Sequence, residues 1–529
     1  MLQSMAFPVW AAALALVILL YVSPSRRHST ALHILVIIVL FAGSVAIRQP
    51  NIGRPLRRHQ EILTAWSLVT LKNWESQGAL THRLCLLQTY PLETDRLVDN
   101  TGIQIFDRDG KGYYVSFPPF SIILPYAFFR LISAEIGVRN IQIFNMAWHF
   151  AAAILLYLGL SVFLSESREG RFGALLAAVF FLLLPGNLWF FSNIYSWDIF
   201  WHYLWVIGIC LIVIIERRSG ENRDNRGILI LLGTTFFLCA YTDNHGVLCA
   251  LAACIYVWIS PVMRRQRRTA ALVLAGAAIL AVAVMVVQYS SISGLRPLLE
   301  HFLQKAQERG SLSEVNPAAI WKHYRNAYMP TIIAILAMLA YLVRSRATFR
   351  AAVFTAREIR YLAFVALPIV LHHLSMMQWT TVHNYAVTKS SVLISLLIGI
   401  LFTRLPKGTT TARILRYAML ALLMAALLIG MRQYEAHYAR VFNVSACRDA
   451  GVLIRQNSND DEVVFAIQTV EKLDADSRVI YYAGRNIKTV KNSKEARQWL
   501  IDHDRNKGVV FRIGPKYRVT LADRISVAN

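Results

Sequence analysis

The sequence predicts an all-α membrane protein of about twelve transmembrane helices, with a small α/β domain at the C-terminal end. Of its 529 residues, 56% are hydrophobic and 16% are charged. The apolar residues form long runs separated by short polar breaks, and a helix needs about 20 mostly apolar residues to cross the hydrocarbon of a bilayer. This composition is typical of a multi-spanning membrane protein and not of a large soluble core. The predicted spans lie near 7–22, 31–47, 141–164, 172–191, 199–215, 228–241, 247–262, 269–289, 329–344, 361–376, 387–403 and 413–431.

Basic residues are unevenly distributed among the connections between these spans. They occur in every second connection, whereas the short connections at 192–197, 242–246 and 377–386 contain no Lys or Arg. Because loops rich in Lys and Arg stay in the cytoplasm, the basic connections are expected there and the others on the extracytoplasmic side of the inner (plasma) membrane. The formal net charge of +24 is therefore explained by topology, and no nucleic-acid partner is expected. The basic connections lie near 26–27, 168–171, 217–226, 264–268, 344–360 and 404–413.

This topology puts three long segments outside, at 48–140, 290–328 and 433–529. In the first, residues 60–74 combine apolar and polar side chains at helical spacing, which predicts a helix lying in the membrane interface. The apolar run 117–133 contains three prolines and is predicted to be a second, half-buried helix, because a full span there would invert the alternation of basic loops.

The tail 433–529 is predicted to form an extracytoplasmic α/β domain after a transmembrane domain of residues 1–432. Ser493 is expected to cap a helix that ends before Gly508. Cys85 and Cys447 are both predicted outside and either form a disulfide or remain two free thiols. The strands expected in the tail are 463–467, 478–484 and 508–513.

Two acidic residues near the outer membrane edge are the first catalytic candidates. Glu61 starts the helix predicted at 60–74, and Asp198 lies at the mouth of a later span. Ionisable groups at such depth are costly unless water, a partner or a ligand satisfies them. The structural alternatives are an acid paired with arginine for Glu61 and a helix cap for Asp198.

Other polar residues are predicted at the same membrane edge, each with a structural alternative. Asp243 is also explained by an Asx turn, and His383 by an ordinary hydrogen bond at a helix end. Carboxylates with cations at a lipid–water boundary suit a lipid-phosphate sugar donor, because a base must deprotonate the acceptor and cations must stabilise the departing phosphate. The candidate binding residues are Arg57, Arg58, His59, Gln60, Asp107, Asp109, Lys111, Tyr114, Asp243, His245, Lys322, Arg325, His383 and Tyr385.

Five short motifs resemble the GT-C superfamily of membrane glycosyltransferases, of the protein mannosyltransferase and aminoarabinose transferase type. They are RHQEILTAW, YYVSFPPFSIILPYAFFRLI followed by GVRN, SWD at Asp198, HNY at His383, and VIYYAGRNI in the tail. The resemblance implies a polyprenyl-phosphate-linked sugar donor, a glycan, lipid or protein acceptor, and inversion at the anomeric carbon. It also implies that an acid in the first outer loop is the general base.

That role maps best onto Glu61, and a second acid of the family maps onto Asp198. Many members have an Asp-Glu pair where this chain has Gln60-Glu61, so Asp107 and Asp109 stay alternatives for the base. The resemblance leaves a divalent cation open, because some members use one and others do not.

A transporter or flippase of a lipid-linked or anionic substrate is the rival class. Transporters are typically built from repeated halves with the binding site near the bilayer midplane. This sequence shows no internal repeat, and its candidate polar residues gather at one edge, which favours the enzyme. Nucleotide-binding, zinc-protease and zinc-finger motifs are also missing from the sequence.

Overall fold

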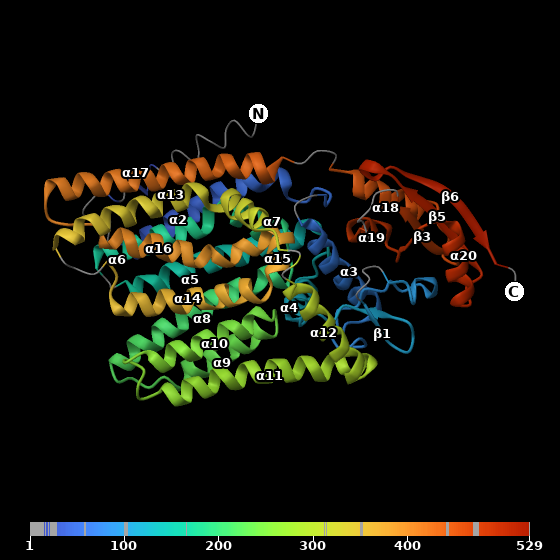
Figure 1. Cartoon of the computed structure of the whole chain (residues 1–529), viewed down its shortest axis with the longest axis horizontal. Helices are drawn as coiled ribbons and strands as arrows, with labels where there is room; N and C mark the ends of the chain where they lie inside the picture. Colours follow the sequence, from blue (N-terminus) through green and yellow to red (C-terminus); the bar gives the residue numbers. More distant parts are fainter. Residues whose placement is uncertain are drawn as a thin grey trace.

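The computed structural model describes residues 15, 17, 18, 21, 29–57, 60–99, 104–164, 167–311, 313, 315–349, 353–440, 444–468 and 476–527. A bundle of long helices makes up most of the molecule, and a small sheet domain lies beyond one end of it (Figure 1). Arg58, His59 and most of the first predicted span, 7–22, lie outside the described residues.

Within the described ranges, seven helices are long and apolar enough to cross a membrane, and an eighth span forms if one bent pair is counted. The prediction of a polytopic helical protein is therefore confirmed, whereas the count of about twelve exceeds the spans recognised by length and composition. The predicted spans at 228–241 and 247–262 are 15-residue helices, α9 (Arg226–Ala240) and α10 (His245–Ile259), and 361–376 lies in α14 (Ala356–Ser375). The seven helices are α2 (Thr30–Arg48), α5 (Val138–Phe163), α8 (Trp197–Gly220), α11 (Arg267–Ser293), α13 (Pro317–Phe349), α16 (Ser391–Arg404) and α17 (Thr410–Tyr434).

The predicted span 172–191 is bent. Helices α6 (Arg168–Leu183) and α7 (Pro185–Asn193) meet at 58°. Pro185 occupies the first position of α7, and Leu184 before it has an extended ψ of 137°. A proline lacks the amide donor and disfavours helical geometry in the residue before it, so the chain changes direction here.

Three ion pairs join the basic connections at one end of the bundle. Arg357 pairs with Glu216 at 2.9 Å and also donates to the carbonyl oxygen of Phe163. At the same end Arg404 binds Glu358, and Lys407 lies 3.5 Å from Glu169. The connections that the sequence assigns to one side of the membrane therefore lie together.

The opposite end carries the first outer segment. The helix predicted at 60–74 is α3 (Glu61–Gln77), and most of its side chains are buried by the bundle and the sheet domain. The helix predicted at 117–133 is α4 (Phe120–Leu131). At 1.5 Å per residue its twelve residues extend about 18 Å, which is too short for a hydrocarbon core of about 30 Å. Short strands β1 (Ile105–Phe106) and β2 (Gly112–Tyr113) form an antiparallel pair between these helices.

The sheet domain has the strand order β4-β3-β5-β6. The first three strands are parallel, and the last is antiparallel to its neighbour. Apolar side chains from β3 and β5 pack against the helices that join the strands, in two clusters that also include Val69, Tyr90 and Val98 of the first outer segment. The strands are β3 (Val463–Gln468), β4 (Lys488–Val490), β5 (Lys507–Ile513) and β6 (Val519–Ser526), and the helices are α18 (Ala446–Gln456), α19 (Ser477–Ala483) and α20 (Ser493–Asp502).

Two predictions in the tail are wrong. The strand predicted at 478–484 is helix α19, because Asp476 caps its first turn and Gly484 ends it with a left-handed φ of 64°. The cap of α20 is Asn492, whose side chain accepts from the amide of Glu495, and Ser493 is the first helical residue. The strands predicted at 463–467 and 508–513 are confirmed as β3 and β5.

An ion pair holds the sheet domain to the first outer segment. Arg485 Nε lies 3.1 Å from Oδ1 of buried Asp95, and the side-chain amide of Asn486 donates to the carbonyl oxygen of the same aspartate. Burial raises the pKa of Asp95 to about 6, and Arg485 opposes that shift. Both Cys85 and Cys447 are buried and free, so the disulfide alternative is not realised.

Candidate active site

Asp198 lies in the first turn of α8, at the end of the bundle opposite the arginine connections. The turn before it is fixed by α3, since Thr64 Oγ1 donates to the carbonyl oxygen of Asn193 and Ser67 Oγ to that of Tyr195.

The side chain of Asp198 is only 2% exposed. Its oxygens contact tertiary partners, accepting from Tyr385 Oη at 3.2 Å and lying 3.5 Å from Lys389 Nζ. The cap position of α8 is Ser196, which makes no side-chain capping bond, so helix capping does not explain Asp198.

Lys389 is a buried cation that the sequence interpretation missed. It lies in the 3₁₀ segment η4 (Asn384–Ser390), is 1% exposed, and has its ammonium 5.1 Å from the ring centroid of Trp201. The predicted span 387–403 contains no other Lys or Arg. A lone ionisable residue inside an apolar run is by itself a functional signal, and it identifies Lys389 without any structure.

A second cation, Arg309, reaches this cluster from α12 (Leu295–Gly310). Its guanidinium carbon lies 5.0 Å from the ring centroid of Phe117 and 4.9 Å from that of Trp379. Arg309 is 8% exposed, and none of the described carboxylates lies within ion-pair distance of it. The ring of Trp197 stacks on Phe117 at 4.7 Å and on Tyr114 at 5.2 Å. Arg309 thus lies against aromatic faces and has no ion-pair partner among the described residues.

Burial raises the pKa of the Tyr114 phenol, and the nearby charge of Arg309 opposes this shift. The phenol is therefore a neutral hydrogen-bonding group beside the guanidinium. We define the buried-charge cluster as Asp198, Lys389, Arg309, Tyr385 and Tyr114.

Three further predicted residues lie around this cluster. Asp243 Oδ1 accepts from the amide of His245 at 2.7 Å, which is the Asx turn foreseen as its structural explanation. The ring of His245 lies 4.2 Å from that of Trp201, and both its nitrogens lack a hydrogen-bond partner within the described part of the chain. His383 packs on Trp379 with ring centroids 3.8 Å apart.

Glu61 has different surroundings. Its carboxylate is fully buried, accepts two hydrogen bonds from Arg54 at 2.8 and 3.1 Å, and accepts a third from the amide of Arg57 at 2.6 Å. Gln60 before it has a left-handed φ of 68°. The Arg57 guanidinium lies 4.5 Å from the ring centroid of Tyr517, so Glu61 stands at the junction with the sheet domain.

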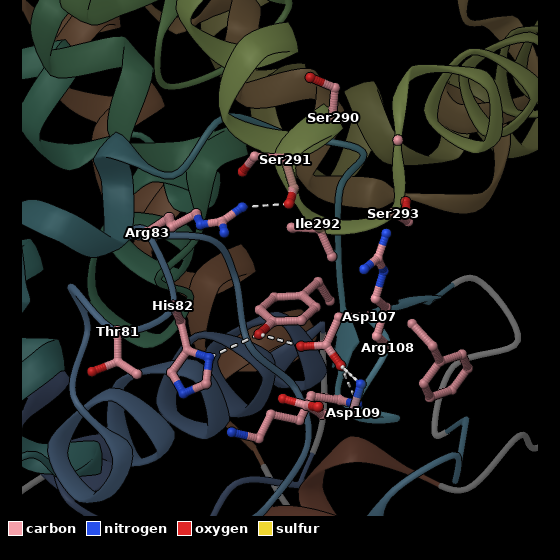
Figure 2. A pocket seen from close by; sticks show the side chains of 14 residues that line it. Thr81, His82, Arg83, Asp107, Arg108, Asp109, Ser290, Ser291, Ile292 and Ser293 are labelled. Carbon is pink, nitrogen blue, oxygen red and sulfur yellow. Dashed lines mark hydrogen bonds between the residues drawn. The ribbon is translucent and has the colours of Figure 1, made fainter.

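Asp107, Asp109 and Lys111 line a cavity of about 820 Å³ between the first outer segment and the end of α11 (Figure 2). Neither Glu61 nor Asp198 belongs to its lining. The phenol of Tyr113 lines this cavity, whereas the next residue, Tyr114, packs on Trp197. The single face expected from the sequence is thus divided into the buried-charge cluster, the Glu61 junction and this cavity.

Lys322 and Arg325 are exposed on α13. The contact from α13 toward the cluster is made instead by Tyr324, which lies between them in the sequence. Its Oη lies 2.7 Å from His373 Nε2 and 2.9 Å from Ser390 Oγ. Among the described residues, no group of three or more His, Cys, Asp or Glu side chains is arranged to hold a metal ion.

Solved membrane transferases have the same arrangement of helices. An oligosaccharyltransferase from Archaeoglobus fulgidus, tethered to an acceptor peptide, matches with a TM-score of 0.58 and 12% identity over 91% of this chain and 69% of its own. ArnT from Cupriavidus metallidurans bound to undecaprenyl phosphate matches with 0.56 and 11% identity over 91% of this chain and 92% of its own. The chain has a GT-C-like fold.

A second structure of the Archaeoglobus fulgidus oligosaccharyltransferase, AglB, is in complex with an inhibitory peptide and a dolichol-phosphate. It matches with a TM-score of 0.58 and 12% identity over 93% of this chain and 74% of its own. No model of a known protein family and no curated protein sequence matches the chain. The structural matches confirm the GT-C-like fold that the resemblance implies.

Proposed function

We propose that this protein is a glycosyltransferase that moves a sugar from a polyprenyl-phosphate donor to an acceptor hydroxyl or amide. The observation that carries the proposal is the buried-charge cluster: Asp198 lies 3.5 Å from Lys389, whereas none of the described carboxylates lies at ion-pair distance from buried Arg309. Buried cations are costly without a counter-charge, and a lipid phosphate would supply it. Two structures with this fold hold such lipids, one undecaprenyl phosphate and the other a dolichol-phosphate.

In this proposal Lys389 and Arg309 bind the donor phosphate. The acceptor attacks the anomeric carbon, the bond from that carbon to the phosphate oxygen breaks, and polyprenyl phosphate leaves with the electron pair. The two cations stabilise the negative charge that develops on the leaving oxygen. The rings of Trp197 and Phe117 exclude water and offer flat apolar faces to the donor.

The acceptor proton goes to a carboxylate, and the contacts favour Asp198 over Glu61 for this role. Glu61 already accepts two bonds from Arg54 and one from a backbone amide, so its lone pairs are largely occupied. Asp198 accepts one hydroxyl at 3.2 Å and has an ammonium at 3.5 Å. Glu61, which the family resemblance suggests as the base, stays the alternative.

We place the cluster on the extracytoplasmic side of the inner membrane, because the arginine connections occupy the other end of the bundle. Cysteine replacements at exposed positions test this orientation in intact cells. Leu80→Cys at the cluster end, where Leu80 is 81% exposed, should react with an impermeant thiol reagent added outside. Asp224→Cys at the arginine end, where the side chain is 73% exposed, should react only after the membrane is opened. The reverse labelling would overturn the orientation.

Binding of undecaprenyl phosphate to the purified protein tests the donor site. Lys389→Met keeps the aliphatic length and removes the charge, so affinity should fall by about tenfold or more. Lys494→Met, at an exposed position of α20, is the matched control and should leave affinity within about twofold of the parent. Equal affinities for the parent and Lys389→Met would remove the cluster from the donor site.

A further inference from the structure

The cavity of Figure 2 lies where a membrane-crossing helix meets the first outer segment. Its wall on one side is the last turn of α11 and the residues after it, including Ser291, Ser293 and Gly294. The other wall comes from the chain around Arg83 and from the β1–β2 turn. Arg83 ties the two walls together by donating to the carbonyl oxygen of Ser291, and its own carbonyl oxygen accepts from Gln288 Nε2 at 2.7 Å.

Three cations line this cavity, Arg83, Arg108 and Lys111. Within the described ranges none of them has a carboxylate at ion-pair distance. The two acids in the lining are Asp107 and Asp109, so the formal charge of the five ionised side chains is +1, three positive minus two negative. The cavity therefore favours an anion.

Asp107 is occupied by the turn that it organises. Its Oδ1 accepts from the amides of Asp109 and Lys111, both at 2.9 Å, and its Oδ2 accepts from Tyr113 Oη at 3.1 Å. Tyr113 Oη is also 2.8 Å from His82 Nδ1. Neutral donors thus fill the hydrogen-bonding positions of Asp107, and its negative charge is already included in the sum of +1.

Two polar atoms beside the cavity have no hydrogen-bond partner among the described residues, His82 Nε2 and Ser293 Oγ. The His82 side chain is 5% exposed, and burial together with the neighbouring charge of Lys111 lowers its pKa. It is therefore a neutral imidazole. A buried polar atom without a partner is costly, and a ligand in the cavity would relieve that cost.

Helix α11 presents an apolar face directly below the cavity. Leu272, Ile279 and Val287 are 69–73% exposed, and they recur at intervals of seven or eight residues, which keeps them on one face of a helix. Ser291 follows Val287 by four residues and continues this face into the cavity. An amphiphile with its chains along α11 would thus bring its headgroup to the cations.

We propose that this cavity binds the headgroup of an anionic bilayer phospholipid, with the phosphate on Arg108 and Lys111 and the acyl chains against α11. A bound lipid would also stiffen the β1–β2 turn, whose strand leads directly to Tyr114 and Phe117 of the candidate active site. The site does not depend on the transfer reaction, and a protein without transferase activity would still bind the lipid.

Lipid retention by the whole protein tests the site. The protein is placed in nanodiscs of phosphatidylcholine with a small fraction of phosphatidylglycerol, and the bound lipid is counted by native mass spectrometry after detergent release. The double variant Arg108→Gln/Lys111→Gln should retain at least fivefold less phosphatidylglycerol than the parent. Lys494→Gln/Arg497→Gln, which removes the same charge from exposed positions of α20, should retain as much as the parent.

A second measurement checks that the loss of bound lipid is not caused by misfolding of the variant. Phosphatidylglycerol should raise the thermal unfolding midpoint of the parent and of the α20 control, but not that of the cavity variant. Equal retention by the cavity variant and the control would overturn the proposal. So would equal retention of phosphatidylcholine and phosphatidylglycerol, or full displacement of the lipid by millimolar glycerol phosphate, which would indicate a site for soluble phosphate.

Discussion

The two ends of helix α8 carry buried acids in opposite situations. Asp198 lies in the first turn and Glu216 eighteen positions later, a separation of about 27 Å at 1.5 Å per residue. Glu216 receives four hydrogen bonds, two from Arg357 at 2.9 and 3.1 Å and one each from Tyr256 and Ser260. Asp198 receives one hydroxyl at 3.2 Å and a distant ammonium at 3.5 Å.

This difference distinguishes an acid whose hydrogen bonds stabilise the fold, Glu216, from an acid that stays available for a ligand, Asp198. At the arginine end each buried acid is satisfied by the protein itself, as the pair of Glu358 with Arg404 repeats. At the other end Arg309 lies against the rings of Phe117 and Trp379 without an ion pair to a described carboxylate, and His245 has no hydrogen-bond partner in the described ranges. Buried polar groups that lack partners lower the stability of the protein. A bound ligand would supply the missing partners.

The largest expected effect is on transfer by Asp198→Asn. Loss of a general base lowers the rate by about a thousandfold, while the unfolding midpoint should stay close to that of the parent because few bonds are lost. Transfer is measured as release of polyprenyl phosphate from a labelled lipid-linked sugar pool. Glu61→Gln, measured in parallel, should fall by only about tenfold, since it acts by holding Arg54. If Glu61→Gln loses more activity than Asp198→Asn, the two roles are exchanged.

The next effect is on stability at the other end of the helix. Glu216→Gln keeps the side-chain volume but weakens the charge-assisted bonds with Arg357, so the free energy of unfolding should fall by about 2 kcal/mol. Denaturant or thermal unfolding in detergent measures this loss. Transfer per folded molecule should remain within about twofold of the parent. A large loss of activity without a loss of stability would contradict the division between the two ends.

The sequence predicted the membrane class and the grouping of basic connections because both depend on composition and charge, which act locally. It also predicted Asp198, Tyr385 and Tyr114, which the structure brings together. It did not predict Arg309 in the cluster, because α12 is amphipathic and its charged residues look like a solvated surface. Lys389 was also missed, although it is the one Lys or Arg in the predicted span 387–403 and could have been recognised from that position.

Other predictions failed at places where contacts between segments distant in the sequence determine the structure. The sequence grouped Asp107 and Lys111 with Asp198, yet Tyr113 at the end of β2 lines the cavity while Tyr114 directly after it packs on Trp197, so the two sites are divided here. In the tail, the run at 478–484 has the β-branched and aromatic residues of a strand. The cap at Asp476 and the left-handed Gly484 instead select a helix, and apolar Val479, Ile480 and Ala483 bury one face of it.

The smallest effect is expected at the Asp95–Arg485 pair, which is buried like Glu216 but lies outside the spans. One oxygen of Asp95 accepts from Arg485 and from the amide of Asn486, and the other lacks a partner in the described part of the chain. Burial outweighs these bonds and raises the pKa of Asp95 from its ordinary value of 3.8 to about 6. The folded protein therefore binds this proton more tightly than the unfolded chain does.

The stability that this carboxyl contributes is complete below pH 3.8 and is lost as the pH rises through about 6. Unfolding midpoints of the parent and Asp95→Asn, measured from pH 4 to pH 7, test the sign, because Asn does not titrate. The midpoint of the parent relative to Asp95→Asn should fall by a few degrees over this range. A relative rise would mean that the attraction of Arg485 exceeds the cost of burial, and Asp95 would then resemble the fully compensated Glu216 instead of the strained Asp198.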